Sequence, residues 1–260
     1  MSQSKPALVI VIPCYNEEEV LPETAERLSG KILQLISAKL ISQKSFLLFV
    51  DDGSKDNTWT LIEKYHKENP LVFSGIKLAR NSGHQNALLC GLLSVKDKAD
   101  VTVSIDADLQ NDINVIDQML IEFLSGCEIV YGVRSGREGD SFFKKTSARF
   151  FYRFMRFCGS ELIYNHSEFR LMSRKALNAL AGRNVTNPFL RGIVPTLGLK
   201  SATVCYDIKK RHAGKSKFTL RKMLWLAYTG ITSCGIIGKY KARKNVKTKQ
   251  NPGYHVEKIL

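Results

Sequence analysis

Asp106 and Asp108 are the residues whose type and spacing point most directly to chemistry. They follow the apolar run VTVSI, and two carboxylates separated by one residue at the end of a strand can face the same cleft because the chain turns there. Carboxylate oxygens suit Mg²⁺ or Mn²⁺, which would bridge diphosphate oxygens and neutralise the charge on a leaving nucleoside diphosphate. Gln110 could add a ligand or orient one. Asp-x-Asp alone is common in surface loops, so its place after a strand is what favours a metal site.

A second acidic motif, Asp51-Asp52-Gly53-Ser54, follows another apolar run. It has two interpretations, which can hold together. Asp, Gly and Ser favour a turn and a helix cap, and one carboxylate could accept hydrogen bonds from a nucleobase or ribose. The chain has no GxGxxG after its first strand and no GxxxxGK[ST]. These absences argue against a dinucleotide site or a P-loop and leave a metal ion to bind the phosphates.

The elements that must position these residues alternate between strands and helices in the first half of the chain. Short β-rich runs are followed by longer segments with apolar residues at helical spacing, which predicts an α/β fold with a mostly parallel sheet and helices on both faces. The predicted strands are 7–13, 46–50, 72–78, 101–105 and 128–133, and the predicted helices are 17–37, 59–66, 84–95 and 113–124.

Polar clusters stand at the carboxyl ends of all five predicted strands. They are Tyr15-Asn16-Glu17, Asp51-Asp52, Arg80-Asn81, Asp106–Asp108 and Arg134. Because ligands bind beyond the carboxyl ends of the strands in such sheets, five clusters on one rim predict a single site.

The second half of the chain is strongly basic. Residues 1–133 contain 12 Lys and Arg against 18 Asp and Glu, whereas residues 134–260 contain 27 against 6. This half is expected to meet anions such as diphosphates, lipid phosphates or an anionic bilayer, although a solvated basic surface is the plainer alternative. A nucleic-acid-binding protein is disfavoured because an RNP-like motif, zinc-ligand spacing and a clear recognition helix are lacking.

The remaining segments are less regular. Strands are expected near 169–172 and 201–206, and helices at 141–157, at 174–181, after Thr186-Asn187-Pro188 and at 218–238, with a basic loop at 209–217 and a poorly structured C-terminal NPGYHVEKIL.

The cysteines and the hydropathy pattern indicate in which cellular compartment the protein works. Six widely spaced cysteines with no CxxC pair are typical of reduced thiols in a cytosolic protein. The N-terminal apolar run ends in polar residues, not in a cleavage site, and no stretch of about 20 uninterrupted apolar residues occurs, so neither a signal peptide nor a full transmembrane helix is predicted.

Together the motifs resemble a known family. PCYNEEE, DDGS, RNSGHQNAL, DADLQ, YGVRSGR, HSEFRLMSR, NPFLRGI and KRHAGKSKFTLRKM, in this order over residues 6–233, are similar to family 2 glycosyltransferases, in particular bacterial polyprenyl-phosphate glycosyltransferases and dolichol-phosphate-mannose synthase. The resemblance implies a GT-A fold, a nucleotide-diphosphate sugar such as a UDP-sugar, a divalent metal ion, an inverting displacement and a polyprenyl phosphate acceptor at the cytoplasmic face of the membrane.

The resemblance also assigns site residues. It implies nucleotide-sugar contacts by Pro13, Tyr15, Glu17, Asp52, Arg80, Asp106 and Lys215. The metal ion would be held by Asp106, Asp108 and Gln110. The acceptor phosphate would meet Arg134, Lys145, Arg149 and Arg170, and the catalytic residues would be Asp108, Glu168 and Arg134.

Two departures from the family pattern matter. Glu168 stands where the family usually has Asp, and it could orient the acceptor or the metal ion instead of removing a proton, because a lipid phosphate is already largely anionic; a structural pair with Arg170 is the alternative. The family also usually continues into two transmembrane helices, whereas here KYKARKNVKTKQ follows. The amphipathic segment 218–238 and the basic tail could lie in an anionic interface, or the segment could pack on the catalytic domain.

These observations give one expected organisation. Residues 1–217 form the catalytic domain, with a nucleotide-binding half at 1–133 and an acceptor-binding half at 134–217, and residues 218–260 form the amphipathic helix and tail. The expected activity is hexose transfer to polyprenyl phosphate for cell-envelope glycans. The alternatives are transfer to a glycan hydroxyl and a catalytically inactive, truncated homologue. Association into a homo-oligomer is a further expectation.

Overall fold

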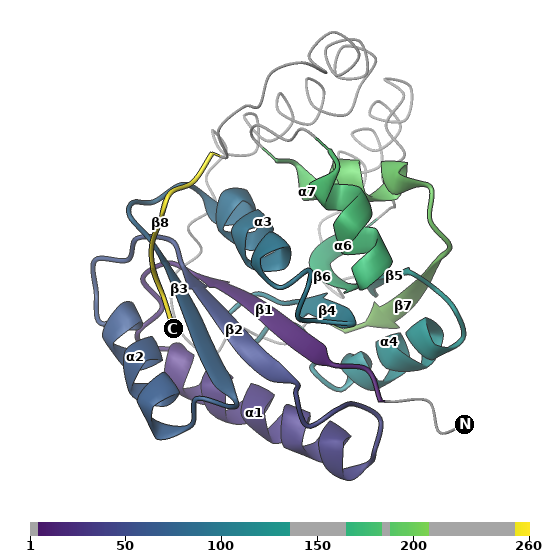
Figure 1. Cartoon of the computed structure of the whole chain (residues 1–260). Coiled ribbons are helices and arrows are strands. Elements are labelled where there is room, and N and C mark those ends of the chain that lie inside the picture. Colours follow the sequence, from purple (N-terminus) through teal and green to yellow (C-terminus); the bar gives the residue numbers. More distant parts are fainter. Residues whose placement is uncertain (1–4, 136–164, 184–187, 208–252) are drawn as a thin grey trace, which may run out of the picture.

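The computed structural model describes residues 5–135, 165–183, 188–207 and 253–260. These residues build a central sheet of eight strands in the order β7-β5-β6-β4-β1-β2-β3-β8 (Figure 1). The strands are β1 Leu8–Cys14, β2 Phe46–Asp51, β3 Phe73–Leu78, β4 Val101–Ser104, β5 Ile129–Arg134, β6 His166–Ser173, β7 Ser201–Tyr206 and β8 Val256–Ile259.

Most neighbouring strands are parallel. β1 pairs in parallel with both β2 and β4, β2 with β3, and β5 with β7. β6 lies between β4 and β5 and is antiparallel to both, and β8 is antiparallel to β3. The amino end of β6 therefore reaches the same rim of the sheet as the carboxyl ends of β1 to β5 and β7.

Helices cover both faces of the sheet. α1 (Leu21–Ser37), α2 (Thr58–Glu68) and α4 (Val115–Leu124) pack into one apolar core, while α3 (His84–Ser94), α6 (Arg174–Ala181) and α7 (Leu190–Ile193) pack into the other (Figure 1). A 3-10 turn, Val194–Leu197, follows α7. The predicted layered α/β fold is thus confirmed, and each face of the sheet has its own core.

The central strands form because they are apolar along their whole length. All seven residues of β1 are buried, which is the pattern of a parallel strand covered on both faces. Gly91 lets α3 approach this strand closely, since a Cβ atom there would lie only 2.5 Å from Val11 Cγ1. This close packing holds the carboxyl-terminal half of α3 against β1 and β2.

The expectation of a poorly structured C-terminus was wrong. β8 adds to the edge of β3, and Ala79 and Leu260 donate backbone hydrogen bonds to His255 and Gly75 across this junction. Tyr254 and Val256 pack against the core that contains α3. The open edge of β3 supplies the backbone partners that no local pattern in this polar segment predicts.

Other predicted elements agree with the structure to within a few residues, with one shift at the first helix. It begins at Leu21 instead of Glu17, because the Glu17 carbonyl accepts turn bonds from Val20 and Leu21. The expected helices at 141–157 and 218–238 and the basic loop at 209–217 lie outside the described residues. Within the described parts, no helix is long and apolar enough to cross a membrane.

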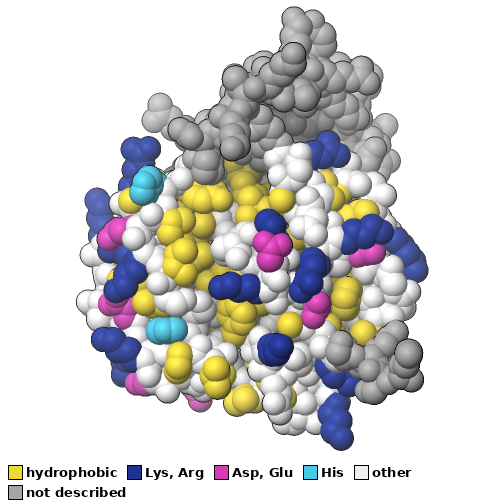
Figure 2. All heavy atoms as spheres, viewed as in Figure 1, with side chains coloured by type: hydrophobic (Ala, Val, Ile, Leu, Met, Phe, Trp, Pro, Cys, Tyr) yellow, Lys and Arg dark blue, Asp and Glu magenta, His cyan; other side chains and the backbone are white. Residues whose placement is uncertain are grey.

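Charged side chains on the face shown in Figure 2 are mixed in sign. Lys and Arg are spread between Asp and Glu, and no continuous basic stripe runs across the described residues of this face. The described residues of this face therefore present both signs of charge to the solvent.

Candidate active site

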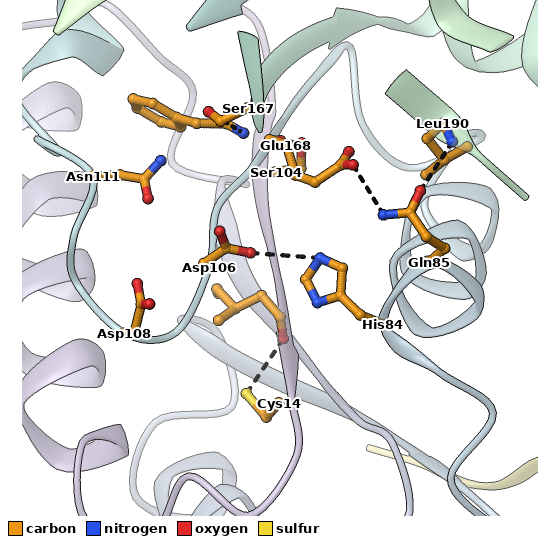
Figure 3. A network of polar contacts seen from close by, with 12 residues as sticks. Cys14, His84, Gln85, Ser104, Asp106, Asp108, Asn111, Ser167, Glu168 and Leu190 are labelled. Carbon is orange, nitrogen blue, oxygen red and sulfur yellow. Dashed lines mark hydrogen bonds and ion pairs between the residues drawn. The ribbon is translucent and has the colours of Figure 1, made fainter. Parts of the chain in front are cut away.

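The polar residues predicted from the strand ends do converge on one rim of the sheet. Asp106 and Asp108 follow β4, and Glu168 belongs to the amino end of β6, which pairs with β4 in antiparallel register. Figure 3 shows these residues near one another, with His84 and Gln85 from the start of α3 facing Asp106 and Glu168, respectively. Three segments distant in the sequence thus contribute to one site.

The Asp106–Asp108 turn presents two carboxylates. The Asp106 side chain is 27% exposed, and its Oδ1 lies 3.5 Å from Nε2 of His84. Asp108 Oδ1 accepts a hydrogen bond from the Gln110 amide, and Leu109 adopts a left-handed conformation with φ of 54°. In Figure 3 Asp106 points toward His84, while Asp108 points into the bend of the loop on the side of Asn111.

The donor atoms of this turn fit a magnesium or manganese ion. Across the described residues, no group of three or more His, Cys, Asp or Glu side chains is placed to hold a metal ion. Mg²⁺ is commonly held by only one or two carboxylates, with water and substrate phosphates completing its shell. Asp106 and Asp108 therefore suit an ion that binds together with a diphosphate, whereas they are too few for a permanently held structural metal.

Glu168 lies at the centre of a buried hydrogen-bond network. It is 3% exposed, and its Oε2 accepts a bond of 2.7 Å from Arg170 Nη2. Its Oε1 accepts bonds of 2.9 Å from Gln85 Nε2 and from Arg191 Nε. The structural pair with Arg170 considered from the sequence is therefore present, and Gln85 and Arg191 extend it.

The charges around Glu168 set its protonation state. Burial alone would raise the pKa of this carboxyl, but the guanidinium groups of Arg191 and Arg170 outweigh it and lower the pKa to about 2. A general base works best with a pKa near the operating pH. Glu168 is thus a permanent carboxylate at neutral pH with little capacity to remove a proton.

The two aspartates of the second acidic motif have different environments. Asp52 is 2% exposed, and its two oxygens accept hydrogen bonds from the backbone amides of Ser82 and Gly83, which fixes the loop before α3. Asp51 accepts a bond from the Ser54 amide, as the predicted turn requires. Burial raises the pKa of both carboxyls. Asp51 Oδ2 is buried without a partner in the described part of the chain.

A second hydrogen-bond centre is the hydroxyl of Tyr206, the last residue of β7. It lies 2.7 Å from the Ser167 hydroxyl and accepts bonds from Asn111 at 3.1 Å and from Arg134 Nε at 3.4 Å. The ends of β5, β6 and β7 are thereby linked to the loop after β4. Arg134, which was predicted to meet a phosphate, is held beside the rim by this contact.

The other predicted site residues are distributed as follows. Pro13 is buried within β1, Tyr15 and Glu17 are half-buried directly after that strand, and Arg80 is exposed after β3. Gln110 is half-buried beside Asp108, and its backbone amide makes the contact noted above. Arg170 has no exposed surface and faces Glu168 and the Leu190 carbonyl. Lys145, Arg149 and Lys215 lie outside the described residues.

Several residues of the site were not assigned a role from the sequence. His84 and Gln85 belong to the RNSGHQNAL motif, Arg191 to NPFLRGI, and Asn111 follows the Asp106–Asp108 turn. Tyr206 carries the weakest signal, a single aromatic residue at a strand end. The position of His84 and Gln85 just beyond a predicted strand was a usable signal, since the same reasoning had already marked Arg80 and Asn81.

Comparison with known proteins extends these observations. Residues 9–181 match the Glycosyl transferase family 2 domain. A Bacillus subtilis protein described as an uncharacterized glycosyltransferase, YkoT, is 53% identical over 236 residues, which cover 91% of this chain and 70% of that protein. The prophage bactoprenol glucosyl transferase homolog of Escherichia coli is 34% identical over 225 residues, covering 86% of this chain and 71% of that protein.

Solved structures share the fold at low sequence identity. Mannosyl-3-phosphoglycerate synthase from Rubrobacter xylanophilus matches with a TM-score of 0.58 and 14% identity, covering 95% of this chain and 78% of its own. Glucosyl-3-phosphoglycerate synthase from Mycobacterium tuberculosis, in complex with Mn²⁺, UDP-glucose and phosphoglyceric acid, matches with a TM-score of 0.52 and 18% identity. This match covers 88% of this chain and 80% of the synthase chain. With the domain match and these relatives, the chain belongs to glycosyl transferase family 2 and is a glycosyltransferase with a GT-A fold.

Proposed function

We propose that this glycosyltransferase moves a hexose from a nucleotide-diphosphate sugar, with UDP as the expected nucleotide, to the phosphate of a polyprenyl phosphate, with inversion at the anomeric carbon. The product would be a lipid-linked sugar for the modification of cell-envelope glycans. The name of the Escherichia coli relative, a bactoprenol glucosyl transferase homolog, supports a lipid acceptor and glucose as a first donor sugar to test.

The observation that carries the proposal is the environment of Glu168. A hydroxyl acceptor must lose its proton as it attacks, and this needs a base with a pKa near neutrality. Glu168, with a pKa of about 2 and contacts to two guanidinium groups and an amide, is poorly suited to that task. A phosphate monoester is already anionic at pH 7 and attacks without such a base. The site therefore favours a phosphate nucleophile over a glycan hydroxyl.

The roles of the other residues follow from their positions. Asp106 and Asp108 would hold Mg²⁺ or Mn²⁺, and the ion supplies charge neutralisation to the departing diphosphate when it is bound. Pro13, Tyr15, Glu17 and the Asp51–Asp52 turn lie at the neighbouring strand ends and would contact the nucleotide. Arg134, the last residue of β5, donates a hydrogen bond to the Tyr206 hydroxyl. We expect its guanidinium to bind the acceptor phosphate.

A lipid acceptor places the reaction at a membrane surface. We expect the basic second half, including Lys145 and Arg149 and the 218–238 segment, to face anionic lipid at the cytoplasmic side, and Lys215 to approach the donor. Arg170 would act through Glu168, because its side chain is entirely buried. Association between copies of the chain is part of the proposal and is tested by the mass of the purified protein in detergent.

The decisive experiment incubates the protein with a panel of radiolabelled nucleotide sugars and polyprenyl phosphate, in the presence of Mn²⁺ or EDTA. The expected result is a labelled lipid that forms with one UDP-hexose and disappears with EDTA. A matched reaction contains polyprenol, which offers a hydroxyl in place of the phosphate. Transfer to polyprenol at a comparable rate would refute the phosphate preference, and absence of transfer despite UDP binding would indicate an inactive homologue.

A further inference from the structure

The turn that carries Asp106 and Asp108 is anchored in the core by the residues that alternate with these carboxylates. Ala107 and Leu109 are 5% and 2% exposed, whereas the Asp106 side chain is 27% exposed. Ala107 belongs to the apolar core that also contains the buried face of α1. The directions of the two carboxylates therefore depend on how the peptide of Ala107 is held.

Thr24 of α1 supplies a hydrogen bond that holds this peptide. Its side chain has no exposed surface, and its hydroxyl donates to the Ala107 carbonyl at 2.7 Å across a sequence separation of 83 residues. The same hydroxyl lies 2.9 Å from the Val20 carbonyl, which is the usual local partner of a threonine in a helix. A hydroxyl carries a single proton, so the two carbonyls share it, and the shorter distance favours Ala107.

Thr24 occupies a position that packing alone would give to an apolar residue. It lies on the buried face of α1 with Leu21, Ala25 and Leu28. A hydroxyl buried among such residues destabilises a protein unless it is hydrogen-bonded. Valine has nearly the same shape and would fill the position without that requirement. What threonine adds over valine between these two elements is the bond to the carbonyl that separates the two carboxylates.

A second contact holds the far end of the same loop. Asn111 is 3% exposed, and its Nδ2 donates to the Tyr206 hydroxyl of β7 at 3.1 Å. The loop is thus held at Ala107 by α1 and at Asn111 by β7, and Asp108 lies between the two anchors (Figure 3). A loop that is fixed before its ligand arrives loses less entropy on binding.

We propose that Thr24 is a positioning residue for a divalent metal ion that binds together with the donor diphosphate. By fixing the Ala107 carbonyl, its hydroxyl sets the relative directions of the carboxylates of Asp106 and Asp108. Mg²⁺ requires near-ideal octahedral geometry, so a small change in the direction of either carboxylate weakens its binding. The inference rests on the proposed function, which supplies the metal ion and the diphosphate.

The test compares two substitutions of Thr24 with a matched control. Thr24→Val removes the hydroxyl and keeps the shape, whereas Thr24→Ser keeps the hydroxyl. The control is Thr102→Val. Thr102 is a fully buried threonine of β4, and its hydroxyl donates to the Met172 carbonyl at 3.2 Å within the sheet, away from the loop.

Two quantities are measured for each variant. The first is the dissociation constant of Mn²⁺ in excess UDP, followed by the electron paramagnetic resonance signal of the free ion, and the second is the melting temperature. Removing a group that orients metal ligands typically weakens metal binding about 10- to 100-fold. We expect Thr24→Val to raise the Mn²⁺ constant by about tenfold or more, and Thr24→Ser and Thr102→Val to stay close to the wild type.

A purely structural role of Thr24 predicts a different pattern. Both valine variants would then lower the melting temperature, while the Mn²⁺ constant of Thr24→Val would stay at the wild-type value, and this result would overturn the inference. Equally weak Mn²⁺ binding by Thr24→Ser and Thr24→Val would also overturn it, because the hydroxyl would not be the cause. If Thr24→Val does not fold, the smaller Thr24→Ala also lacks the hydroxyl and is expected to show the same rise in the Mn²⁺ constant.

Failure of the inference can be separated from failure of the proposed function. The Mn²⁺ measurement needs no acceptor and no turnover, so it remains valid if the wild-type protein transfers no sugar to polyprenyl phosphate. In that case the proposed acceptor is wrong, and the Mn²⁺ constants of the Thr24 variants still decide the inference. A wild-type protein that binds no Mn²⁺ in the presence of UDP would refute the metal assignment and the inference together.

Discussion

Replacing Glu168 by Gln tests the reasoning on which the proposed function depends. The substitution preserves the size of the side chain and one acceptor oxygen but removes the negative charge. Arg170, which has no exposed surface, would then be a buried cation without a partner of opposite charge. The loss of stability therefore measures how strongly the carboxylate is held as an anion, which is the property that makes it a poor base.

Two routes give a similar magnitude for this loss. The pKa of Glu168 falls from 4.5 to about 2, and a shift of that size corresponds to about 3 kcal/mol of unfolding free energy above pH 4.5. Removing one partner of a buried ion pair usually costs about 3–5 kcal/mol, because the other charge is left uncompensated. We therefore expect Glu168→Gln to lower the free energy of unfolding by about 3 kcal/mol at pH 7.

The sign of the pH dependence follows from the lowered pKa. The carboxylate contributes its full stabilisation above the unfolded-state value of 4.5, and this contribution is lost as the pH falls toward about 2. The difference between wild type and variant should therefore be constant near neutrality and shrink as the pH falls below 4.5. Urea denaturation at several pH values between 7 and the acid unfolding limit measures it.

Two further variants serve as controls. Glu257→Gln removes an exposed carboxylate that pairs with Lys77 at 3.0 Å, and we expect a change below about 1 kcal/mol. Adding Arg170→Met to Glu168→Gln removes the orphaned cation and should restore part of the lost stability. A loss smaller than about 1 kcal/mol for Glu168→Gln at pH 7 would refute the buried ion pair as described, and with it the argument against Glu168 as a base.

Three further predictions concern other parts of the site. Asp108→Asn should abolish metal-dependent sugar transfer; a normal rate across a Mn²⁺ titration would exclude this carboxylate as a ligand. Gly53→Ala should destabilise the protein by about 1–3 kcal/mol and weaken UDP binding. The reason is that φ of Gly53 is +67° and that the added Cβ would lie 2.6 Å from the Arg80 carbonyl carbon. An unchanged melting temperature and UDP affinity would contradict this prediction. Tyr206→Phe should cost about 1–3 kcal/mol, since Ser167 and Asn111 lose a buried partner; unchanged urea denaturation would show that the hydroxyl does not stabilise the strand ends.

The sequence by itself determined the layered fold and predicted which rim of the sheet carries the candidate site. Runs of buried-type residues separated by helical periodicity define parallel strands, and the direction of each strand follows from its connections. Because all carboxyl ends of such strands lie on one rim, polar clusters at 106–108 and 134 could be assigned to the same site without coordinates. This inference needs only local patterns and chain connectivity.

The tertiary structure decided which partners each polar group has. Gln85 and Glu168 are 83 residues apart, and Arg191 reaches the same carboxylate from a third element. No periodicity in the sequence encodes such contacts, yet they determine whether the carboxyl of Glu168 is a base or a fixed anion. Likewise, the polar C-terminal segment becomes β8 only because the edge of β3 offers unpaired backbone groups. Local chemistry therefore specified the rim, and burial and long-range pairing specified the protonation state and orientation of the groups on it.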